Sequence, residues 1–159
     1  MRVEPLKKSF GAKVYDLRIP ELGTEQLDAI YSLWLKYALL IFPEQNLNND
    51  QQIKFAKNFG ALEFDLSPIS NVRGDGSIRD ANDDDIVKSL RGNMEWHHDS
   101  TYMPIQAKGA VFTAHTVPSK GGETGWADMR AAYDNLSENM KNKIEDLSAF
   151  HSYEWSQKE

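Results

Sequence analysis

The residues best suited to chemistry gather in one short segment, EWHHDSTY at residues 95–102. We predict an extended strand over residues 94–102, and side chains at positions i and i+2 of a strand point to the same face. His97 and Asp99 can therefore converge on one metal ion, while His98 points the other way. An imidazole and a carboxylate on one face supply two corners of the two-histidine, one-carboxylate triad that holds non-haem iron(II) and leaves coordination positions open.

The spacing alone does not establish a metal site. A His and an Asp two positions apart also fit a solvated surface strand, and motifs this short match often by chance. Of the other histidines, we expect His115 to be a satisfied strand histidine and His151 to be a surface or cleft residue. Lone histidines take such roles more often than they bind metals.

Composition narrows the chemistry further. The 159-residue chain has no cysteine, which excludes disulfides, iron–sulfur clusters and thiol nucleophiles and leaves nitrogen and oxygen as metal ligands. With 18 basic and 24 acidic residues the net charge is −6, so nucleic-acid binding is not expected. No apolar stretch approaches the roughly 18 residues of a membrane span, and the first residues do not resemble a signal peptide. We predict a cytoplasmic protein without a membrane partner.

The first 60 residues predict two strands and two amphipathic helices. Residues 12–19 alternate as a strand does, and the apolar run 38–42, stopped by a proline, predicts a buried strand. Thr24 is the predicted N-cap of the first helix, and Asn49 with Gln52 starts the second like a capping box. Their apolar faces are Leu27, Ile30, Tyr31, Trp34 and Leu35 in the first helix and Ile53, Ala56 and Phe59 in the second, which Gly60 ends.

The later part of the chain is predicted to consist of short strands and turns. Residues 69–72 form a short strand, 73–76 a turn and 80–85 a solvated acidic loop that lacks the glycine and glutamate of a calcium loop. Further strands are expected at 94–102, 109–117 and 123–127, followed by a helix capped by Asp128 and ending at Tyr133, and one capped by Ser137 and ending at Leu147. This order predicts an α+β or mainly β domain with flanking helices.

Several motifs occur in a fixed order around the central segment. They are GN at 92–93, WHxDS at 96–100, VPSxGGET at 117–124 and ADMRAAYDxLS at 127–137, preceded by DQQIxFAxxFG at 50–60 and ISNV at 69–72. In these motifs the chain resembles the taurine dioxygenase and dichlorophenoxyacetate dioxygenase family of iron(II)/2-oxoglutarate oxygenases, nearer the dichlorophenoxyacetate branch. The resemblance covers nearly the whole chain.

The resemblance implies a role for each matching position. His97 and Asp99 would be the iron ligands. Thr124 and Asn93 would bind the 2-oxoglutarate cosubstrate, with Asn93 lining the active site. The substrate contacts would be Asn71, Ser100 and Tyr102. The implied fold is a double-stranded β-helix, or jelly roll, with the metal inside its open end. The implied reaction uses iron(II), 2-oxoglutarate and O2 to hydroxylate a small, anionic organic substrate, with decarboxylation of 2-oxoglutarate to succinate.

The family pattern also needs a second histidine ligand and an arginine for 2-oxoglutarate, and neither has a place in this sequence. We therefore expect residues 1–159 to be the N-terminal part of a single catalytic domain, with an incomplete jelly roll and little activity alone. Exposed apolar surface would then favour association into a homo-oligomer. The alternative is a catalytically silent jelly-roll domain that serves binding or assembly. A halogenase is disfavoured, because its iron lacks the carboxylate that Asp99 provides.

Overall fold

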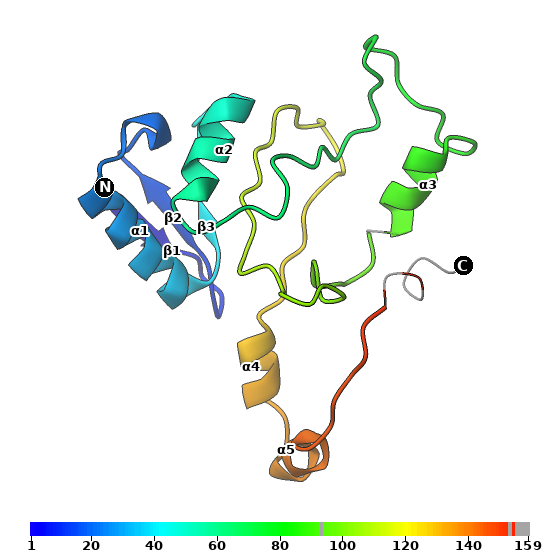
Figure 1. The fold of residues 1–159 in the computed structure, drawn as a ribbon. Coiled ribbons are helices and arrows are strands. Elements are labelled where there is room, and N and C mark those ends of the chain that lie inside the picture. The colour runs from blue at the N-terminus through cyan, green and yellow to red at the C-terminus, as the bar shows by residue number, and fades with distance from the viewer. Residues whose placement is uncertain (93, 153, 155–159) are drawn as a thin grey trace. The chain divides into compact units, whose positions relative to one another are not determined.

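The computed structural model describes residues 1–92, 94–152 and 154. The chain forms two compact units (Figure 1), of which unit 1 comprises Met1–Leu62 with Val111–Leu147. Unit 2 comprises Glu63–Ala110 with the residues from Ser148 onward.

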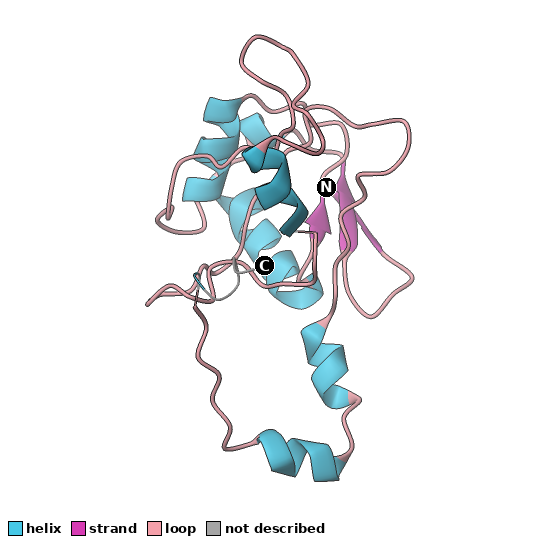
Figure 2. Ribbon diagram, turned by 90° about the vertical axis from the view of Figure 1, so that its right-hand side faces the viewer, coloured by secondary structure: helices cyan, strands magenta, loops and turns pink. Residues whose placement is uncertain are grey.

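A three-stranded sheet lies in unit 1, drawn in magenta in Figure 2. Its strands are β1 (Arg2–Pro5), β2 (Ala12–Tyr15) and β3 (Leu40–Ile41), paired in that order. The pair β1–β2 is antiparallel, and β2–β3 is parallel with Ala12 opposite Leu40. Gly11 precedes β2 with a φ of +92°, a conformation that residues with a Cβ rarely adopt, and an added Cβ would lie 2.7 Å from Leu6 Cδ1, so a side chain there would be strained.

Two helices and a short 3-10 turn complete the packed part of unit 1. Helix α1 (Thr24–Tyr37) connects the parallel strands β2 and β3, and α2 (Asn49–Lys57) follows β3. The buried core cluster consists of Ile19, Ile30, Leu47 and Phe55. Fully burying an apolar side chain of this size stabilises a fold by about 1.5–3 kcal/mol. The later segment of unit 1 joins this core through Val111, whose carbonyl accepts a hydrogen bond of 2.9 Å from Gln52 Nε2.

Both predicted N-terminal helices exist, but each N-cap lies one residue earlier than expected. The N-cap of α1 is Gly23, and the N-cap of α2 is Asn48. Asn48 Oδ1 accepts from Gln51 N at 2.9 Å, while Gln51 Oε1 accepts from Asn48 N at 3.0 Å. This capping box uses the pair one position before Asn49 and Gln52, which satisfies the free N–H groups of the first turn.

The predicted strands around these helices are shorter than expected. β2 ends at Tyr15, since Asp16 takes a left-handed φ of +59°, which a strand cannot continue through. The predicted strand 38–42 reduces to the two residues of β3, because Ala38 is the left-handed C-cap of α1.

The two predicted C-terminal helices are confirmed in unit 1. Helix α4 (Met129–Asp134) has Asp128 as its N-cap, with the carboxylate accepting from the N–H groups of Arg130 and Ala131. Helix α5 (Glu138–Ile144) has Ser137 as its N-cap and ends before the predicted Leu147. Neither helix contains a buried residue.

The described residues of unit 2 form turns, irregular chain and one named helix. An antiparallel bridge joins Val72 to Ile78 around the predicted turn, in which Gly76 N donates to Arg73 O at 2.9 Å. Helix α3 (Asp85–Gly92) was not predicted. In the part of the chain that the structure describes, no helix has the length and apolar character to cross a bilayer.

The strands predicted at 94–102, 109–117 and 123–127 are wrong for the described residues, and the strand at 69–72 reduces to the single bridge at Val72. A strand exists only where its backbone pairs with a neighbouring strand. These segments have no such neighbour among the described residues, so they form turns and irregular extended chain. The α+β class is confirmed, with helix more abundant than strand in the described part of the chain.

Candidate metal site

The structure brings His97 and Asp99 together within unit 2. Nε2 of His97 lies 3.2 Å from Oδ1 of Asp99, and the two side chains are 49% and 60% exposed. The pair forms at a turn, since Asp99 and Ser100 are turn residues. The predicted strand is therefore absent, but the two predicted side chains meet.

A hydrogen bond fixes which nitrogen of the His97 ring is available. Nδ1 lies 2.7 Å from the carbonyl oxygen of Glu95. A carbonyl only accepts, so Nδ1 must carry the hydrogen, and in the neutral ring Nε2 has the free lone pair. That lone pair faces a carboxylate oxygen of Asp99. Two acceptors this close repel unless a proton or a metal cation lies between them. A proton on Nε2 makes the contact an ion pair, and a metal cation would take the same place, so the pair is a candidate metal site.

The turn that carries Asp99 has an unusual residue at its next position. Ser100 has a left-handed φ of +59° and is buried, with 9% of its surface exposed. Its Oγ donates to Oε2 of Glu63 at 2.8 Å, and its carbonyl accepts from Met103 N at 3.1 Å. The substrate contact expected of Ser100 stays a prediction, and in the structure its hydroxyl donates to Glu63. Sequence reasoning missed Glu63, because no local pattern links two residues that lie 37 positions apart.

His98 has partners different from those of His97. Its Nδ1 lies 2.8 Å from the carbonyl of Asp99, and Nε2 of Gln106 lies 3.0 Å from the same ring nitrogen. Within the described residues, no group of three or more His, Cys, Asp or Glu side chains is placed to hold a metal ion. In this part of the chain the candidate site therefore consists of the His97 and Asp99 pair alone.

The other predicted site residues belong to both units, and one of them lies outside the described residues. Asn93 lies outside the described residues. Asn71 and Tyr102 are exposed residues of unit 2, and the Asn71 carbonyl accepts from Arg79 N at 2.8 Å. Thr124 belongs to unit 1, where it is exposed after Gly121 and Gly122, whose φ values of +77° and +75° form the predicted turn.

The acidic loop of unit 2 is not simply solvated, as the sequence suggested. The Asp84 side chain is only 12% exposed, and its Oδ2 lies 2.9 Å from Arg73 Nη2 and 3.3 Å from Arg79 Nη1. Burial opposes ionisation of Asp84, but hydrogen bonds from Arg79 and from the N–H of Ile86, with the Arg79 charge, keep its pKa below the ordinary value. The loop is thus fastened by a carboxylate shared between two guanidinium groups.

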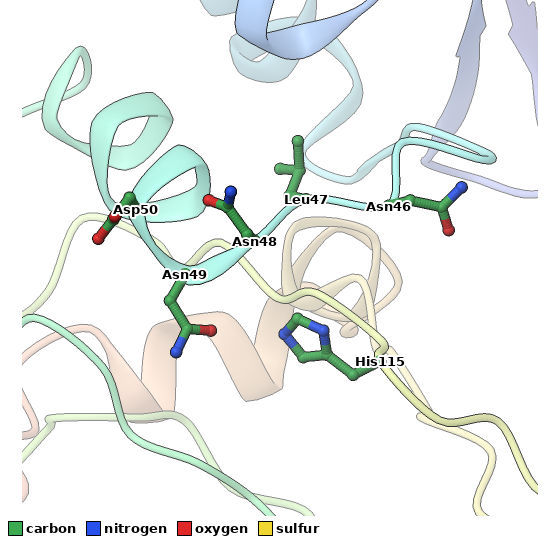
Figure 3. Close-up of a pocket in the computed structure, with 6 residues that line it drawn as sticks. All are labelled: Asn46, Leu47, Asn48, Asn49, Asp50 and His115. Atoms are coloured by element: carbon green, nitrogen blue, oxygen red, sulfur yellow. The ribbon is translucent and has the colours of Figure 1, made fainter.

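An open surface pocket with a volume of about 690 Å³ lies in unit 1, at the start of α2. It is lined by Asn46, Leu47, Asn48, Asn49, Asp50 and His115, and Figure 3 shows the His115 ring directed toward the first turn of α2. His115 is exposed and lies outside any strand, so its predicted role as a satisfied strand histidine is wrong. His151 is exposed, as predicted.

Comparison with known proteins extends these observations. The family described as "Taurine catabolism dioxygenase TauD, TfdA family" matches residues 2–159. A (S)-phenoxypropionate/alpha-ketoglutarate-dioxygenase of Sphingobium herbicidovorans is 54% identical over 156 residues, which are 98% of this chain and 54% of that protein. An alpha-ketoglutarate-dependent 2,4-dichlorophenoxyacetate dioxygenase of Cupriavidus pinatubonensis is 36% identical over 163 residues, covering 92% of this chain and 56% of the relative.

A solved structure has a similar fold. The crystal structure of AAD-2 in complex with Mn(II) and N-oxalylglycine superposes with a TM-score of 0.87 at 35% identity, over 99% of this chain and 58% of AAD-2. The chain thus spans about half the length of the relatives that it matches.

Proposed function

The chain belongs to the taurine catabolism dioxygenase TauD, TfdA family, and from this premise we propose that it supplies the metal-binding N-terminal part of an iron(II)/2-oxoglutarate-dependent dioxygenase. The observation that carries the proposal is the pair of His97 Nε2 and Asp99 Oδ1, 3.2 Å apart, with Nδ1 of the histidine bound to a backbone carbonyl.

The donor set of this pair fits a divalent iron. A neutral imidazole nitrogen and a carboxylate oxygen are two of the three protein ligands of non-haem iron(II) oxygenase sites. The Glu95 carbonyl is the outer-shell partner that such a histidine needs, since it holds the ring with Nε2 free. Asp99 adds one negative charge and His97 none, so an iron at this site would keep enough positive charge to attract anionic 2-oxoglutarate.

The remaining residues are proposed to bind and orient. The Thr124 hydroxyl would donate to a carboxylate of 2-oxoglutarate without adding charge. Asn93 is proposed to line the active site beside the cosubstrate, and Asn71, Ser100 and Tyr102 are proposed to contact the substrate. With iron, 2-oxoglutarate and dioxygen bound, the centre would supply the oxidation that hydroxylates the substrate and converts 2-oxoglutarate to succinate and carbon dioxide.

Names of relatives support the choice of a small anionic substrate. One relative is named for phenoxypropionate and another for 2,4-dichlorophenoxyacetate, and both names denote aryloxy carboxylates. We propose the same class of substrate here. The relatives' greater length supports a single catalytic domain of which residues 1–159 are the N-terminal part, with a jelly roll that further chain would complete. Cytoplasmic location, homo-oligomer formation and the lack of nucleic-acid or membrane partners stay predictions.

Metal titration tests the proposal on the chain itself. Mn(II) binding, followed by the loss of the free-ion electron paramagnetic resonance signal, should occur in the parent chain and should weaken strongly in His97→Ala and in Asp99→Ala. His98→Ala is the matched control, because the neighbouring ring has other partners and should leave the affinity unchanged. The loss should exceed the roughly 10- to 100-fold that removal of an outer-shell partner costs.

A second arm addresses the reaction. The chain is joined to the C-terminal half of the 54% identical relative, and iron(II) with 2-oxoglutarate is added without oxygen. A visible charge-transfer band that disappears in His97→Ala supports the proposal. A chain that binds no Mn(II), in a fusion that gives no band, would instead favour the catalytically silent domain.

A further inference from the structure

We infer that Glu63 is a positioning residue for the proposed metal site: its carboxylate holds Ser100, and Ser100 holds the turn that aims Asp99 at His97. This inference rests on the proposed function, because it assigns a role to Glu63 only if the pair binds a metal. Glu63 lies 37 residues before Ser100, so the hydrogen bond between them closes a long loop onto the candidate site.

The burial of Ser100 is the first observation behind this inference. It is the only buried residue among the described residues of unit 2, and its neighbours His97, His98 and Asp99 are all exposed. A buried hydroxyl is costly unless it is hydrogen-bonded. Its partner is a carboxylate at 2.8 Å, and hydrogen bonds to ionised acceptors are stronger than those between neutral groups. Ser100 is therefore an anchored point in a region that is otherwise open to solvent.

The backbone of Ser100 is the second observation. A φ of +59° is unfavourable for a residue with a Cβ, and such a conformation persists only where surrounding contacts enforce it. Two contacts do so here, from Oγ to Glu63 and from Met103 N to the Ser100 carbonyl. Because Ser100 directly follows Asp99, these contacts hold the backbone from which the Asp99 side chain extends.

The two donors of the pair are thus held by separate means. The His97 ring is held by the carbonyl of Glu95, and Asp99 is held through the link from Ser100 to Glu63. Loss of the link would leave the His97 ring in place and let the Asp99 carboxylate turn away. The consequence is a weaker metal site in which both ligands are still present.

Metal affinity of four variants tests the inference. In Mn(II) titrations of the full chain, Glu63→Ala and Ser100→Ala should each weaken binding by roughly 10- to 100-fold, the range typical of outer-shell partners. Glu63→Gln keeps an oxygen that can accept from Ser100 and should restore affinity close to that of the parent. The double variant Glu63→Ala/Ser100→Ala should be no worse than either single variant, since both remove the same link.

These variants separate positioning from direct ligation. If Glu63 were itself a metal ligand, Glu63→Gln would bind as poorly as Glu63→Ala, and the inference would be wrong. Ser100→Gly adds a further control, because glycine adopts positive φ without cost but lacks the hydroxyl. It should weaken binding less than Ser100→Ala, which keeps the strained backbone and loses its anchor.

A readout without metal separates this inference from the proposed function. The amide of Met103 reports the turn directly, since it donates to the Ser100 carbonyl at 3.1 Å. Its hydrogen exchange should accelerate in Glu63→Ala and Ser100→Ala but not in Glu63→Gln, while the Gly76 amide in the distant turn stays unchanged. Unchanged Met103 exchange in Glu63→Ala overturns the inference. Accelerated exchange in a chain that binds no Mn(II) would keep the link to Glu63 and reject the metal site instead.

Discussion

Residues 1–62 and residues 63–110 are held in shape by different forces. The buried apolar residues Ala12, Val14, Ile19, Ile30, Leu47 and Phe55 all belong to the first region. Among the described residues of the second region no apolar side chain is buried, and its single buried residue is Ser100. The first region is therefore stabilised by apolar burial, whereas the second, which carries the candidate metal pair, depends on polar contacts.

Several of those polar contacts join residues close in sequence, and they involve acidic side chains. Asp75 accepts from the backbone and hydroxyl of Ser77, Asp80 accepts from two backbone N–H groups, and Asp84 pairs with two arginines. Such bonds shape turns but remove little apolar surface from water. Large side chains accordingly remain exposed, as for Trp96 at 74%, Ile78 at 71% and Ile105 at 88%. This surface is suited to packing against further protein.

The comparison has a functional consequence. Binding sites tend to lie in regions that open at low free energy, and a ligand that binds only the folded form stabilises it. A metal at His97 and Asp99 would therefore order residues 63–110 more than residues 1–62. The two regions should therefore respond to different kinds of substitution.

The largest change in the free energy of unfolding is expected from a substitution in the apolar core. Phe55 is 6% exposed, and the centroid of its ring lies 5.1 Å from the ring centroid of Phe59 and 5.9 Å from that of Phe42. Phe55→Ala should lower the free energy of unfolding by about 3–5 kcal/mol, because it removes a buried ring and leaves a cavity. The measurement is urea unfolding followed by far-ultraviolet circular dichroism. Leu35→Ala in α1 is the control, since Leu35 is 61% exposed and should change the value by less than about 0.5 kcal/mol.

The same contrast explains what the sequence could predict of the fold. The helices α1 and α2 follow from apolar residues at helical spacing, although Leu35, expected in the core, is exposed. The caps Asp128 and Ser137 were predicted because a cap and its helix are neighbours in sequence. The strands at 94–102, 109–117 and 123–127 were not predictable in this way, since alternation indicates a face but not a pairing partner. Helix α3 was missed although Ile86, Val87 and Leu90 lie at helical spacing, so its sequence does carry a helix signal.

In the candidate site, too, the residues that lie close together in the sequence were predicted and the more distant or backbone partners were not. His97 and Asp99 were found because their spacing is short, and they meet at a turn instead of on a strand. The partners that hold them were missed for two reasons. Glu95 acts through its backbone carbonyl, which side-chain patterns do not reveal, and Glu63 acts across 37 residues.

An intermediate change in the free energy of unfolding is expected at the start of α2. There the N-cap in the structure lies one residue before the N-cap predicted from the sequence. Asn48→Ala should lower the free energy of unfolding by about 1 kcal/mol, because Asn48 Oδ1 accepts from Gln51 N at 2.9 Å. Asn49→Ala should change it by less than about 0.5 kcal/mol, since Asn49 is an exposed residue inside the first turn. Urea unfolding measures both. The reverse order would place the cap at Asn49, as the sequence first suggested, and would contradict the structure.

The smallest effect on global unfolding is expected from the acidic loop, where the change should be local. Asp84→Ala removes the carboxylate that Arg73 and Arg79 share, so the Arg79 amide, which donates to the Asn71 carbonyl at 2.8 Å, should exchange faster. The urea midpoint should stay close to that of the parent, because no apolar core depends on this loop. Asp83→Ala, at an exposed neighbouring position, is the control for charge and should leave the exchange unchanged.

The pH dependence of hydrogen exchange at the Arg79 amide tests whether the negative charge of Asp84 protects that amide. Burial opposes ionisation of Asp84, but the hydrogen bonds from Arg79 and Ile86 outweigh it, so its pKa in the folded chain lies below the ordinary value of 3.8. A lowered pKa means that the stabilisation is fully present above the ordinary value and disappears as pH falls through the folded value. The parent and Asp84→Ala should therefore differ in Arg79 exchange at pH 6 and converge in strong acid. A difference that persisted there would assign the loop's order to packing instead of to the shared carboxylate, and the contrast between the two regions would lose its electrostatic basis.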